Sequence, residues 1–452
     1  MNHLERWFRV AQAGSTVRRE VGAGAVTFLS LSYILFVQPA VLSHAGMDTQ
    51  GVLFATCVAS AIGCFAMAAL TNYPIALAPA MGHNFFFAYT ICGLMGYSWQ
   101  QALAANLIAG ALFLLLAGTR IRERIMEAIP QPVMFGLAAG IGLLIAVLGL
   151  QWGALVVGDP ATLVKLGDLG HPVAMLTLFG LAVTSVLIVL RVPGGVLIGL
   201  LVTAFAGWLA SGWFGLSTPL VEYHGVVAAP PAPTTAFALD FEGLFALPWS
   251  GLLFVVLTLI ILDLFDSAGT LIGLASRADM LVEGRLPRAK GALVADASAT
   301  SVGACLGTST VTSYVESAAG IAAGGRTGLV AVTVGVLFLL ALFFLPLVEM
   351  VGSGVPSGAG QEVRYYPVIA PVLILVGVLM MGSVRRIDWE DPCTAIPAFL
   401  TLIVIPMSLS ITDGIAWGMI SYSLLALVGR RPAPWRVDGF AVGFVLRYAF
   451  LM

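Results

Sequence analysis

Two aspartates lie close together in one of the most apolar parts of the chain. The stretch LDLFDSAGT at 262–270 contains Asp263 and Asp266. Residues at positions i and i+3 project from the same face of a helix. Two neighbouring carboxyl groups in surroundings of low dielectric do not both ionise easily, so at least one is expected to hold a proton near neutral pH. The pair therefore predicts a site that couples proton binding to another event.

Two more acids occur in apolar stretches, Glu316 in SYVESAAG and Asp296 in LVADASAT. A carboxylate at the centre of a membrane-spanning helix costs about 2.5–3.5 kcal/mol on insertion scales, so such residues are rare and usually functional. Asp296 is followed by several hydroxyl residues, and we interpret it as structural support that ties neighbouring helices together. A functional role as a fourth intramembrane acid is the alternative for Asp296.

Further candidate site residues occur where two other apolar stretches are interrupted. Asn84 has an amide with both a donor and an acceptor, and His83 beside it could titrate or serve in packing. Phe85 begins a run of three phenylalanines, which favours either stacking on a flat ring or simple helix packing. Ser313 precedes Glu316 in the same stretch. We expect Asn84, Phe85, Ser313 and the acids Asp263, Asp266 and Glu316 to bind the substrate, and we assign proton coupling to Asp263, Asp266, Glu316 and His83.

The apolar segments contain no matched pair of basic residues. A pocket with acceptors and no fixed cation favours a neutral or cationic ligand rich in N–H groups, because an anion would meet the carboxylates unpaired. The five cysteines are scattered singly, which argues against a disulfide framework and a metal cluster. We therefore expect no metal and no cofactor, and H⁺ as the coupling ion.

The elements that position these residues must be membrane helices. The chain has 452 residues, of which 59% are hydrophobic and 10% charged, with a mean hydropathy of +1.00; a soluble domain carries about 25% charged residues. The N-terminus has no apolar core or cleavage site typical of a removable signal peptide. The net charge of −2 suggests no nucleic-acid partner. The composition thus predicts a multi-pass protein of the cell membrane in contact with the lipid bilayer, and it is compatible with a monomer or a homodimer.

Apolar runs predict an all-α protein with about fourteen transmembrane segments. These are 21–44, 50–71, 76–94, 100–118, 131–152, 172–190, 194–213, 249–275, 291–307, 310–323, 327–350, 367–383, 394–411 and 414–429. With both termini cytoplasmic, only Lys165 and Arg364 of the 21 basic residues fall outside the cell, in agreement with the tendency of Lys and Arg to accumulate on the cytoplasmic side. A short amphipathic piece at 121–130 is expected at the cytoplasmic face.

Two of these segments are interrupted at matching places. They are 76–94 and 310–323, the third segment of the first seven and of the second seven. Short, interrupted segments in corresponding positions of two halves are typical of transporters built from inverted repeats, where half-helices form the binding site near the middle of the membrane. The alternative is that both are merely short helices with packing glycines.

The chain divides accordingly into a cytoplasmic N-terminus, a first repeat, an extracytoplasmic connector rich in Pro and Thr, a second repeat, and a cytoplasmic or interfacial C-terminus. Their limits are 1–20, 21–213, 214–248, 249–429 and 430–452.

Four motifs in order resemble the nucleobase–cation symporter family of xanthine/uracil permeases, and within it the hypoxanthine/guanine/adenine (AzgA-like) branch. They are NYPIALAPAMGHNFFFAY at 72–89, LDLFDSAGTLIG at 262–273, GRLPRAKGALVADASAT at 284–300 and GTSTVTSYVESAAGIAAGGRTGL at 307–329. The resemblance implies two inverted seven-segment repeats, with a core domain (segments 1–4 and 8–11) that moves against a gate domain (segments 5–7 and 12–14). It implies proton-coupled purine uptake, with Asn84, Asp263, Asp266 and Glu316 at the family's polar positions.

Two features depart from the family pattern. Members of this branch usually read GMGLN where this chain has AMGHN, so Ala80 and His83 change the surroundings of Asn84. The stretch between segments eleven and twelve, at 351–367, is longer than usual. The departure near Asn84 bears on the identity of the substrate more than on the mechanism.

Three other functions compete with purine transport. The first is proton symport of another N–H-rich heterocycle, such as a pyrimidine. The second is an anion exchanger or channel, because such families share the architecture and fold alone does not give function. The third is an intramembrane aspartyl protease, which needs its two aspartates on different helices, whereas Asp263 and Asp266 lie one turn apart on the same helix. The sequence therefore predicts a transporter rather than an enzyme.

Overall fold

The described part of the chain consists mainly of helices. The structure is a computed structural model and describes residues 3–117, 119, 130–213, 219–278, 280, 286–352, 354–356, 364–430 and 435–450. The predicted amphipathic piece at 121–130, except its last residue, lies outside the described residues. So do parts of the predicted connector, of the stretch at 351–367 and of the C-terminus, namely 214–218, 353, 357–363, 431–434 and 451–452.

Each predicted segment of the first repeat corresponds to one or more elements. A short helix α1 (His3–Trp7) precedes them. The segments are α2 (Val17–Leu31) with α3 (Ile34–Ser43), α4 (Thr49–Thr71), β1 (Leu77–Pro79) with α5 (Met81–Phe85) and the π-helix η1 (Phe86–Leu94), α6 (Trp99–Leu116), α8 (Gln131–Trp152), α9 (Pro172–Val189) and α10 (Gly195–Trp213). A hairpin of β2 (Val156–Asp159) and β3 (Leu163–Leu166) connects α8 to α9.

The second repeat corresponds in the same way. After α11 (Phe241–Ala246), its segments are α12 (Trp249–Arg277), α13 (Ala289–Leu306), β4 (Val311–Ser313) with α14 (Ser317–Ala322), α15 (Leu329–Ala341) with η2 (Leu342–Phe344) and α16 (Leu345–Gly352), α17 (Ala370–Met380) with η3 (Met381–Arg386), α18 (Pro392–Ser408) and α19 (Ile411–Val428). The strands β5 (Val355–Pro356) and β6 (Arg364–Tyr365) pair before α17, and α20 (Trp435–Phe450) follows α19. Within the described ranges, nine helical stretches are long and apolar enough to cross a membrane.

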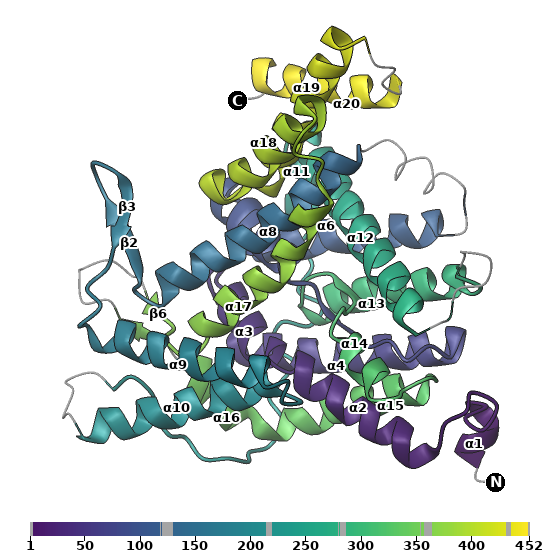
Figure 1. Ribbon diagram of the computed structural model, residues 1–452, viewed down its shortest axis with the longest axis vertical. Coiled ribbons are helices and arrows are strands. Elements are labelled where there is room, and N and C mark those ends of the chain that lie inside the picture. Colours follow the sequence, from purple (N-terminus) through teal and green to yellow (C-terminus); the bar gives the residue numbers. More distant parts are fainter. Residues whose placement is uncertain are drawn as a thin grey trace. The chain divides into compact units, whose positions relative to one another are not determined.

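The chain forms two compact units (Figure 1). Unit 1 comprises Met1–Thr119, Trp152–Leu155 and Leu166–Val372, and unit 2 comprises Arg120–Gln151, Val156–Lys165 and Leu373–Met452. Unit 1 thus contains both interrupted segments and all of the predicted site residues. The assignment of individual segments to a core and a gate domain stays a prediction.

In unit 1 the two interrupted segments complete each other. The strands β1 and β4 pair antiparallel, with Leu77 opposite Ser313 and Pro79 opposite Val311. The N–H of Ala80 donates to the Thr310 carbonyl at 2.9 Å, which extends this ladder. Backbone polar groups at membrane depth must be satisfied within the protein, and extended backbone is tolerated there only where protein surrounds it. Each broken segment therefore satisfies the backbone of the other.

Close packing around the paired strands β1 and β4 fixes their place among the helices of unit 1. A Cβ added at Gly63 of α4 would lie 2.9 Å from the Ala299 side chain of α13 and 3.2 Å from Leu77 of β1. At the end of α13, Gly307 has a φ of +98°, a conformation that glycine adopts at no steric cost. This turn leads the chain from α13 into β4. In Figure 1, α12, α13 and α14 lie in this part of unit 1.

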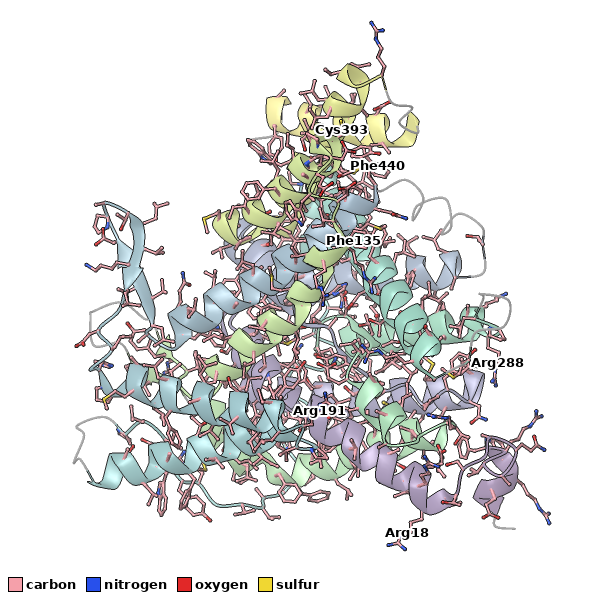
Figure 2. All side chains as sticks on the ribbon, viewed as in Figure 1. Arg18, Phe135, Arg191, Arg288, Cys393 and Phe440 are labelled. Carbon is pink, nitrogen blue, oxygen red and sulfur yellow. The ribbon has the colours of Figure 1, made fainter. Side chains whose placement is uncertain are left out.

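The surface of unit 1 carries several of the basic residues that the sequence analysis placed in the cytoplasm. Arg18 and Arg288 are exposed, and both side chains extend from the ribbon in Figure 2. The Arg288 guanidinium lies over the Tyr73 ring, 5.0 Å from its centroid, and the Arg288 N–H donates to the Tyr73 hydroxyl at 3.1 Å.

In unit 2, α18 and α19 form a tight helical hairpin. The chain turns at Leu409, whose φ is 53°, and Thr401 of α18 packs against Gly418 of α19, where a Cβ would lie 2.0 Å from the Thr401 hydroxyl. The C-terminal helix α20 presents exposed apolar residues, Val442, Val445 and Leu446. Its predicted position at the membrane surface stays a prediction.

Candidate functional site

The strand β4 directs neighbouring side chains toward two different acids. The Thr312 hydroxyl donates to Asp266 Oδ2 of α12 at 3.2 Å. The next residue, Ser313, donates to Asp296 Oδ1 of α13 at 2.9 Å. Successive residues of a strand point to opposite faces, so two consecutive residues connect one strand to acids on two different helices.

Glu316 lies where β4 ends and α14 begins. Its Oε1 accepts a hydrogen bond from the Tyr33 hydroxyl at 2.7 Å. Tyr33 lies at the break between α2 and α3, so a break in segment one faces the break in segment ten. Glu316 is half-buried, and its neighbour Val315 is 60% exposed. The carboxyl group therefore lies at the border of the accessible surface.

Asp266 is the most accessible of the four predicted acids. Its side chain is exposed, although its helix α12 has the hydropathy of a membrane span. Within the described residues, the ion pairs found are Lys165–Asp159 and His224–Glu222, so neither Asp266 nor Glu316 has a basic partner there. The two carboxyl groups remain acceptors with unused lone pairs on an accessible surface.

Asp263 and Asp296 are buried, with 3% and 0% of their surface exposed, respectively. The Ser267 hydroxyl lies 3.5 Å from Asp263 Oδ1. Asp296 Oδ2 has no hydrogen-bond partner among the described residues. A buried carboxylate without a counter-charge is costly unless it is hydrogen-bonded or neutralised. These two acids form a second, inner pair behind the accessible pair of Asp266 and Glu316.

Asn84 is fully buried near the end of α5, the short helix of the other interrupted segment. Its Oδ1 accepts a short hydrogen bond from the Ser309 hydroxyl, and Ser309 accepts one from Gln38 Nε2 at 3.0 Å. This chain of bonds joins α3, the turn before β4, and α5. Asn84 Nδ2 has no partner among the described residues, so the amide keeps two donors.

The remaining predicted site residues are also buried. His83, Phe85 and Ser313 are 3%, 1% and 2% exposed. His83 Nε2 has no hydrogen-bond partner among the described residues, and the Phe85 ring stacks on Tyr89 at 6.0 Å. The structure thus brings all predicted residues together around the paired strands β1 and β4, which we call the β1–β4 crossing, but it leaves only Asp266 and Glu316 accessible.

Sequence reasoning missed Tyr33, Thr312, Gln38 and Ser309. Gln38 and Tyr33 had a usable signal, because both are polar residues inside the first apolar segment. Thr312 and Ser309 had none, since hydroxyl residues are common in membrane helices and only the pairing of β1 with β4 determines where they point. In the described ranges, no group of three or more His, Cys, Asp or Glu side chains could hold a metal ion.

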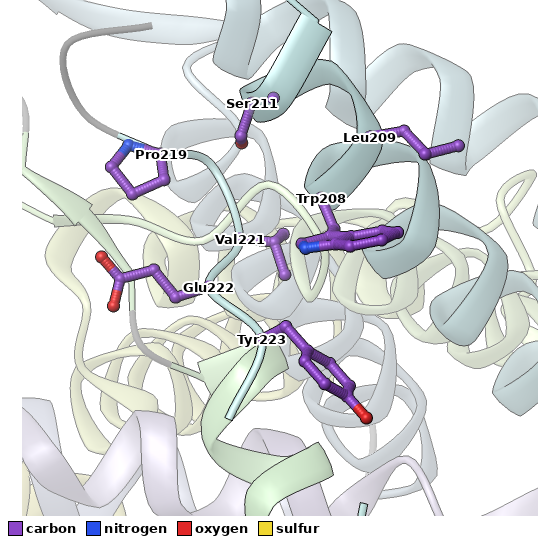
Figure 3. A pocket seen from close by; sticks show the side chains of 8 residues that line it. Trp208, Leu209, Ser211, Pro219, Val221, Glu222 and Tyr223 are labelled. Atoms are coloured by element: carbon purple, nitrogen blue, oxygen red, sulfur yellow. The ribbon is translucent and has the colours of Figure 1, made fainter. Parts of the chain in front are cut away.

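A separate pocket of about 600 Å³ lies at the end of α10 (Figure 3). It is lined by the rings of Trp208 and Tyr223, 6.2 Å apart, and by Glu222. Both rings are exposed, and Glu222 pairs at the surface with His224 at 3.6 Å. None of the predicted site residues lines this pocket, so we place the candidate site at the β1–β4 crossing.

Comparison with known proteins agrees with this architecture. Residues 18–417 match a protein family described as "Permease family" (Xan_ur_permease). The chain is 45% identical to putative permease MJ0326 of Methanocaldococcus jannaschii over 455 residues, which cover 100% of this chain and 99% of the relative. It is 40% identical to adenine permease AdeP of Escherichia coli, covering 99% and 96%. It is 41% identical to guanine/hypoxanthine permease PbuG of Bacillus subtilis, covering 99% and 100%.

Solved structures with the same fold are more distant in sequence. The transmembrane domain of the cyanobacterial bicarbonate transporter BicA aligns with a TM-score of 0.61 at 15% identity, covering 89% of this chain and 97% of that chain. SLC26A9 aligns with a TM-score of 0.62 at 13% identity, and the alignment covers 92% of this chain and 66% of that chain. At such identities the likeness shows the fold alone. It confirms the predicted all-α fold of two inverted repeats with core and gate domains. The chain therefore belongs to the xanthine/uracil permease family, and it is a multi-pass membrane transporter rather than an enzyme.

Proposed function

We propose that the protein takes up purine nucleobases of the hypoxanthine, guanine and adenine class across the cell membrane, coupled to protons. The relatives AdeP and PbuG, which align over almost the whole chain, are named as permeases for adenine and for guanine and hypoxanthine. We further propose that both termini are cytoplasmic and that the core domain carries the substrate against the gate domain.

One observation carries the proposal: two acids, Asp266 and Glu316, meet the accessible surface of a membrane unit without a basic partner in the described residues. Their free lone pairs can accept hydrogen bonds from ring N–H and exocyclic amino groups. A ligand with several N–H donors would satisfy both, whereas an anion would be repelled. A purine base has this donor pattern and a flat apolar body.

The other predicted residues have supporting roles in this proposal. Asn84 would fix the orientation of the substrate through its two unpartnered N–H donors. Phe85 and Ser313, which are buried, would hold the walls of the site and come into contact with the ring when the site rearranges around it. Ser313 also holds Asp296 through its hydroxyl at 2.9 Å.

The inner pair of acids is the proposed place of the coupling proton. Asp263 and Asp296 are both buried, and Ser267 lies beside Asp263. Two carboxyl groups near one another in a site of low dielectric resist ionising together. In our proposal a proton taken up from outside neutralises this region, with Asp263 as its main carrier and Asp266, Glu316 and His83 as further groups that exchange it. Proton and substrate leave to the cytoplasm, and the empty core domain returns.

The decisive experiment is uptake of labelled hypoxanthine, guanine and adenine into proteoliposomes with and without an inward proton gradient. We expect gradient-dependent uptake of at least one purine, and loss of uptake in Glu316→Gln with normal amounts of protein in the membrane. Glu222→Gln, at an exposed surface acid, is the matched control and should transport normally. Normal uptake by Glu316→Gln would refute the assignment.

Two outcomes would favour the competing functions. In a competition panel against a labelled purine, stronger inhibition by pyrimidines than by purines would indicate another heterocycle as the substrate. A current that depends on chloride or sulfate would indicate an anion exchanger or channel.

A further inference from the structure

The rings of four residues of unit 1, which come from four separate stretches of the chain, form one cluster. His44 directly follows α3, Tyr89 lies in η1, Trp152 is the last residue of α8, and Tyr366 precedes α17. The His44 ring stacks on Trp152 with centroids 5.1 Å apart and an interplanar angle of 10°. It lies 5.5 Å from Tyr89 and 5.9 Å from Tyr366, and Trp152 lies 4.6 Å from Tyr366. We call these four residues the ring cluster.

Hydrogen bonds hold the ring cluster in this arrangement. His44 Nδ1 lies 2.9 Å from the Ala40 carbonyl. Because a carbonyl only accepts, Nδ1 carries the hydrogen and neutral His44 has its Nε2 unprotonated. The Tyr366 N–H donates to the Trp152 carbonyl at 2.8 Å. The central stack is thus fixed through the backbone on both sides.

The ring cluster is connected to the candidate site by stacked rings. Tyr89 stacks on Phe85 at 6.0 Å and 22°, and Phe85 is the neighbour of Asn84. His44 follows the helix that carries Gln38, whose amide donates to Ser309 at 3.0 Å. A line of rings therefore runs from His44 through Tyr89 to Phe85, the last residue of α5.

The members of the ring cluster differ in exposure. His44 is exposed, whereas Trp152 and Tyr366 are 5% and 4% exposed. The imidazole thus covers the two larger rings from the outside. In the topology proposed above, segments one, three and five all end at the extracytoplasmic side, and segment twelve begins there.

We propose that the ring cluster is the extracytoplasmic gate of the transport path and that the His44–Trp152 stack is the contact that holds it closed. The proposal rests on the transport function and topology proposed above. Opening requires His44 to leave Trp152, after which a flat heteroaromatic substrate could pass along Tyr89 and Phe85 toward Asp266 and Glu316.

His44 makes this gate sensitive to outside pH. Although His44 as a residue is exposed, the stack on Trp152 removes one face of its ring from solvent, and this desolvation lowers the pKa of His44; the hydrogen bonds to the Ala40 and Val41 carbonyls oppose this only in part. The other titratable groups on the elements packed here are the Tyr89 and Tyr366 phenols, Arg364 beside Tyr366, Glu349 bound to Gln50, and Asp48 bound to Gly51 and Thr234. No ion pair of His44 occurs among the described residues.

Protonation of His44 and opening of the gate are thermodynamically linked. A histidine with a lowered pKa in the closed state binds protons more weakly there than in the open state, where the ring no longer stacks on Trp152 and has the ordinary pKa of about 6.5. Closure is therefore strongest above about pH 6.5 and weakens as the pH falls below that value. Acid outside the cell opens the gate, in the direction that proton-coupled uptake requires.

The test measures gate opening without any substrate. In a chain whose five native cysteines are replaced, Val315→Cys places a thiol beside Glu316, where the native side chain is 60% exposed. A membrane-impermeant thiol reagent is added outside oriented proteoliposomes. The rate at which the reagent labels Val315→Cys is divided by the rate at which it labels Val227→Cys, a 66% exposed position of the connector. This ratio cancels the pH dependence of the thiol chemistry.

We expect labelling of Val315→Cys to rise on going from about pH 7.5 to about pH 5.5. His44→Ala should raise the labelling rate of Val315→Cys at the higher pH by roughly fivefold, which corresponds to the free energy of one aromatic pair. It should also remove the pH dependence of labelling. His44→Phe keeps a ring without a titrating group and should stay slow at both pH values. Trp152→Ala should behave like His44→Ala.

Unchanged labelling in both His44→Ala and Trp152→Ala would overturn the gate, and an unchanged pH dependence in His44→Phe would overturn the role of His44. Each variant is first checked by size-exclusion chromatography for normal folding. Because labelling needs no purine, a chain that transports no purine but shows these rates would refute the proposed substrate and not the gate.

Discussion

The Tyr33 hydroxyl donates a hydrogen bond to Glu316 Oε1 at 2.7 Å, although 283 residues separate the two in the chain. Tyr33 lies at the break between α2 and α3, and Glu316 lies at the break between β4 and α14. The bond therefore connects the first segment of one repeat to the interrupted segment of the other. It also occupies one lone pair of Glu316 and so determines which acceptors remain for a ligand.

Removing this hydroxyl should weaken substrate binding. In Tyr33→Phe the ring stays in place, but Glu316 loses the donor that orients it. A hydrogen bond to a charged group contributes about 1.5–3 kcal/mol, so we expect KM for purine uptake to rise by about tenfold or more. Uptake kinetics in proteoliposomes measure this, with Tyr223→Phe at the surface pocket as control. A KM equal to that of the parent would show that the bond does not orient the carboxylate.

The two neighbouring hydroxyls of β4 should have separable effects. Thr312→Val removes the donor to Asp266 and should change KM, because Asp266 is accessible. Ser313→Ala removes the donor to the buried Asp296 and should shift the pH profile of uptake with a smaller change in KM at the optimum. Measuring KM at a series of pH values distinguishes the two. If both variants shift the same parameter, the division into accessible and inner acids is wrong.

Glu20 should stabilise unit 1 without taking part in transport. This fully buried carboxylate of α2 accepts hydrogen bonds from the Arg326 N–H at 3.0 Å, the Thr327 N–H at 3.0 Å and the Thr327 hydroxyl at 2.8 Å. Glu20→Ala leaves these donors unpaired, at a cost of about 1–3 kcal/mol for each buried group that finds no new partner. We expect a melting temperature in detergent several degrees lower than that of the exposed control Glu242→Gln. Equal melting temperatures would contradict this role.

The β2–β3 hairpin should lose local order in acid. The Lys165 ammonium, 3.0 Å from Asp159, and the N–H groups of Ala161 and Thr162 lower the pKa of Asp159. An acid with a lowered pKa contributes stability that is complete above its ordinary value of about 3.9 and is lost as the pH falls through the lowered value. Hydrogen exchange of residues 156–166 should therefore be unchanged between neutral pH and about pH 5 and faster below about pH 3.5.

The same hairpin offers an internal control. In Asp159→Asn the amide cannot pair with Lys165, so exchange should be fast and independent of pH after correction for the intrinsic rate. Slow exchange in this variant would mean that other contacts hold the hairpin.

The sequence by itself determined the fold class and indicated the candidate site residues. Apolar runs of spanning length, the distribution of Lys and Arg, and the two interrupted segments at matching positions predicted an inverted-repeat transporter, and the family and fold comparisons confirm this architecture. The four acids stood out because a carboxyl group in an apolar segment is costly and is kept only for a reason. Such signals are local, so they can be read from the order of residues.

Only the tertiary structure decided which of these residues are accessible and what holds them. The pairing of β1 with β4 directs Thr312 toward Asp266 and Ser313 toward Asp296, because successive residues of a strand point to opposite faces. The same crossing buries Asn84 against Ser309 and brings Tyr33 to Glu316. The ring cluster around His44 likewise joins four segments far apart in the chain. These contacts depend on register and on the close approach of distant helices, which the local pattern of apolar and polar residues does not encode.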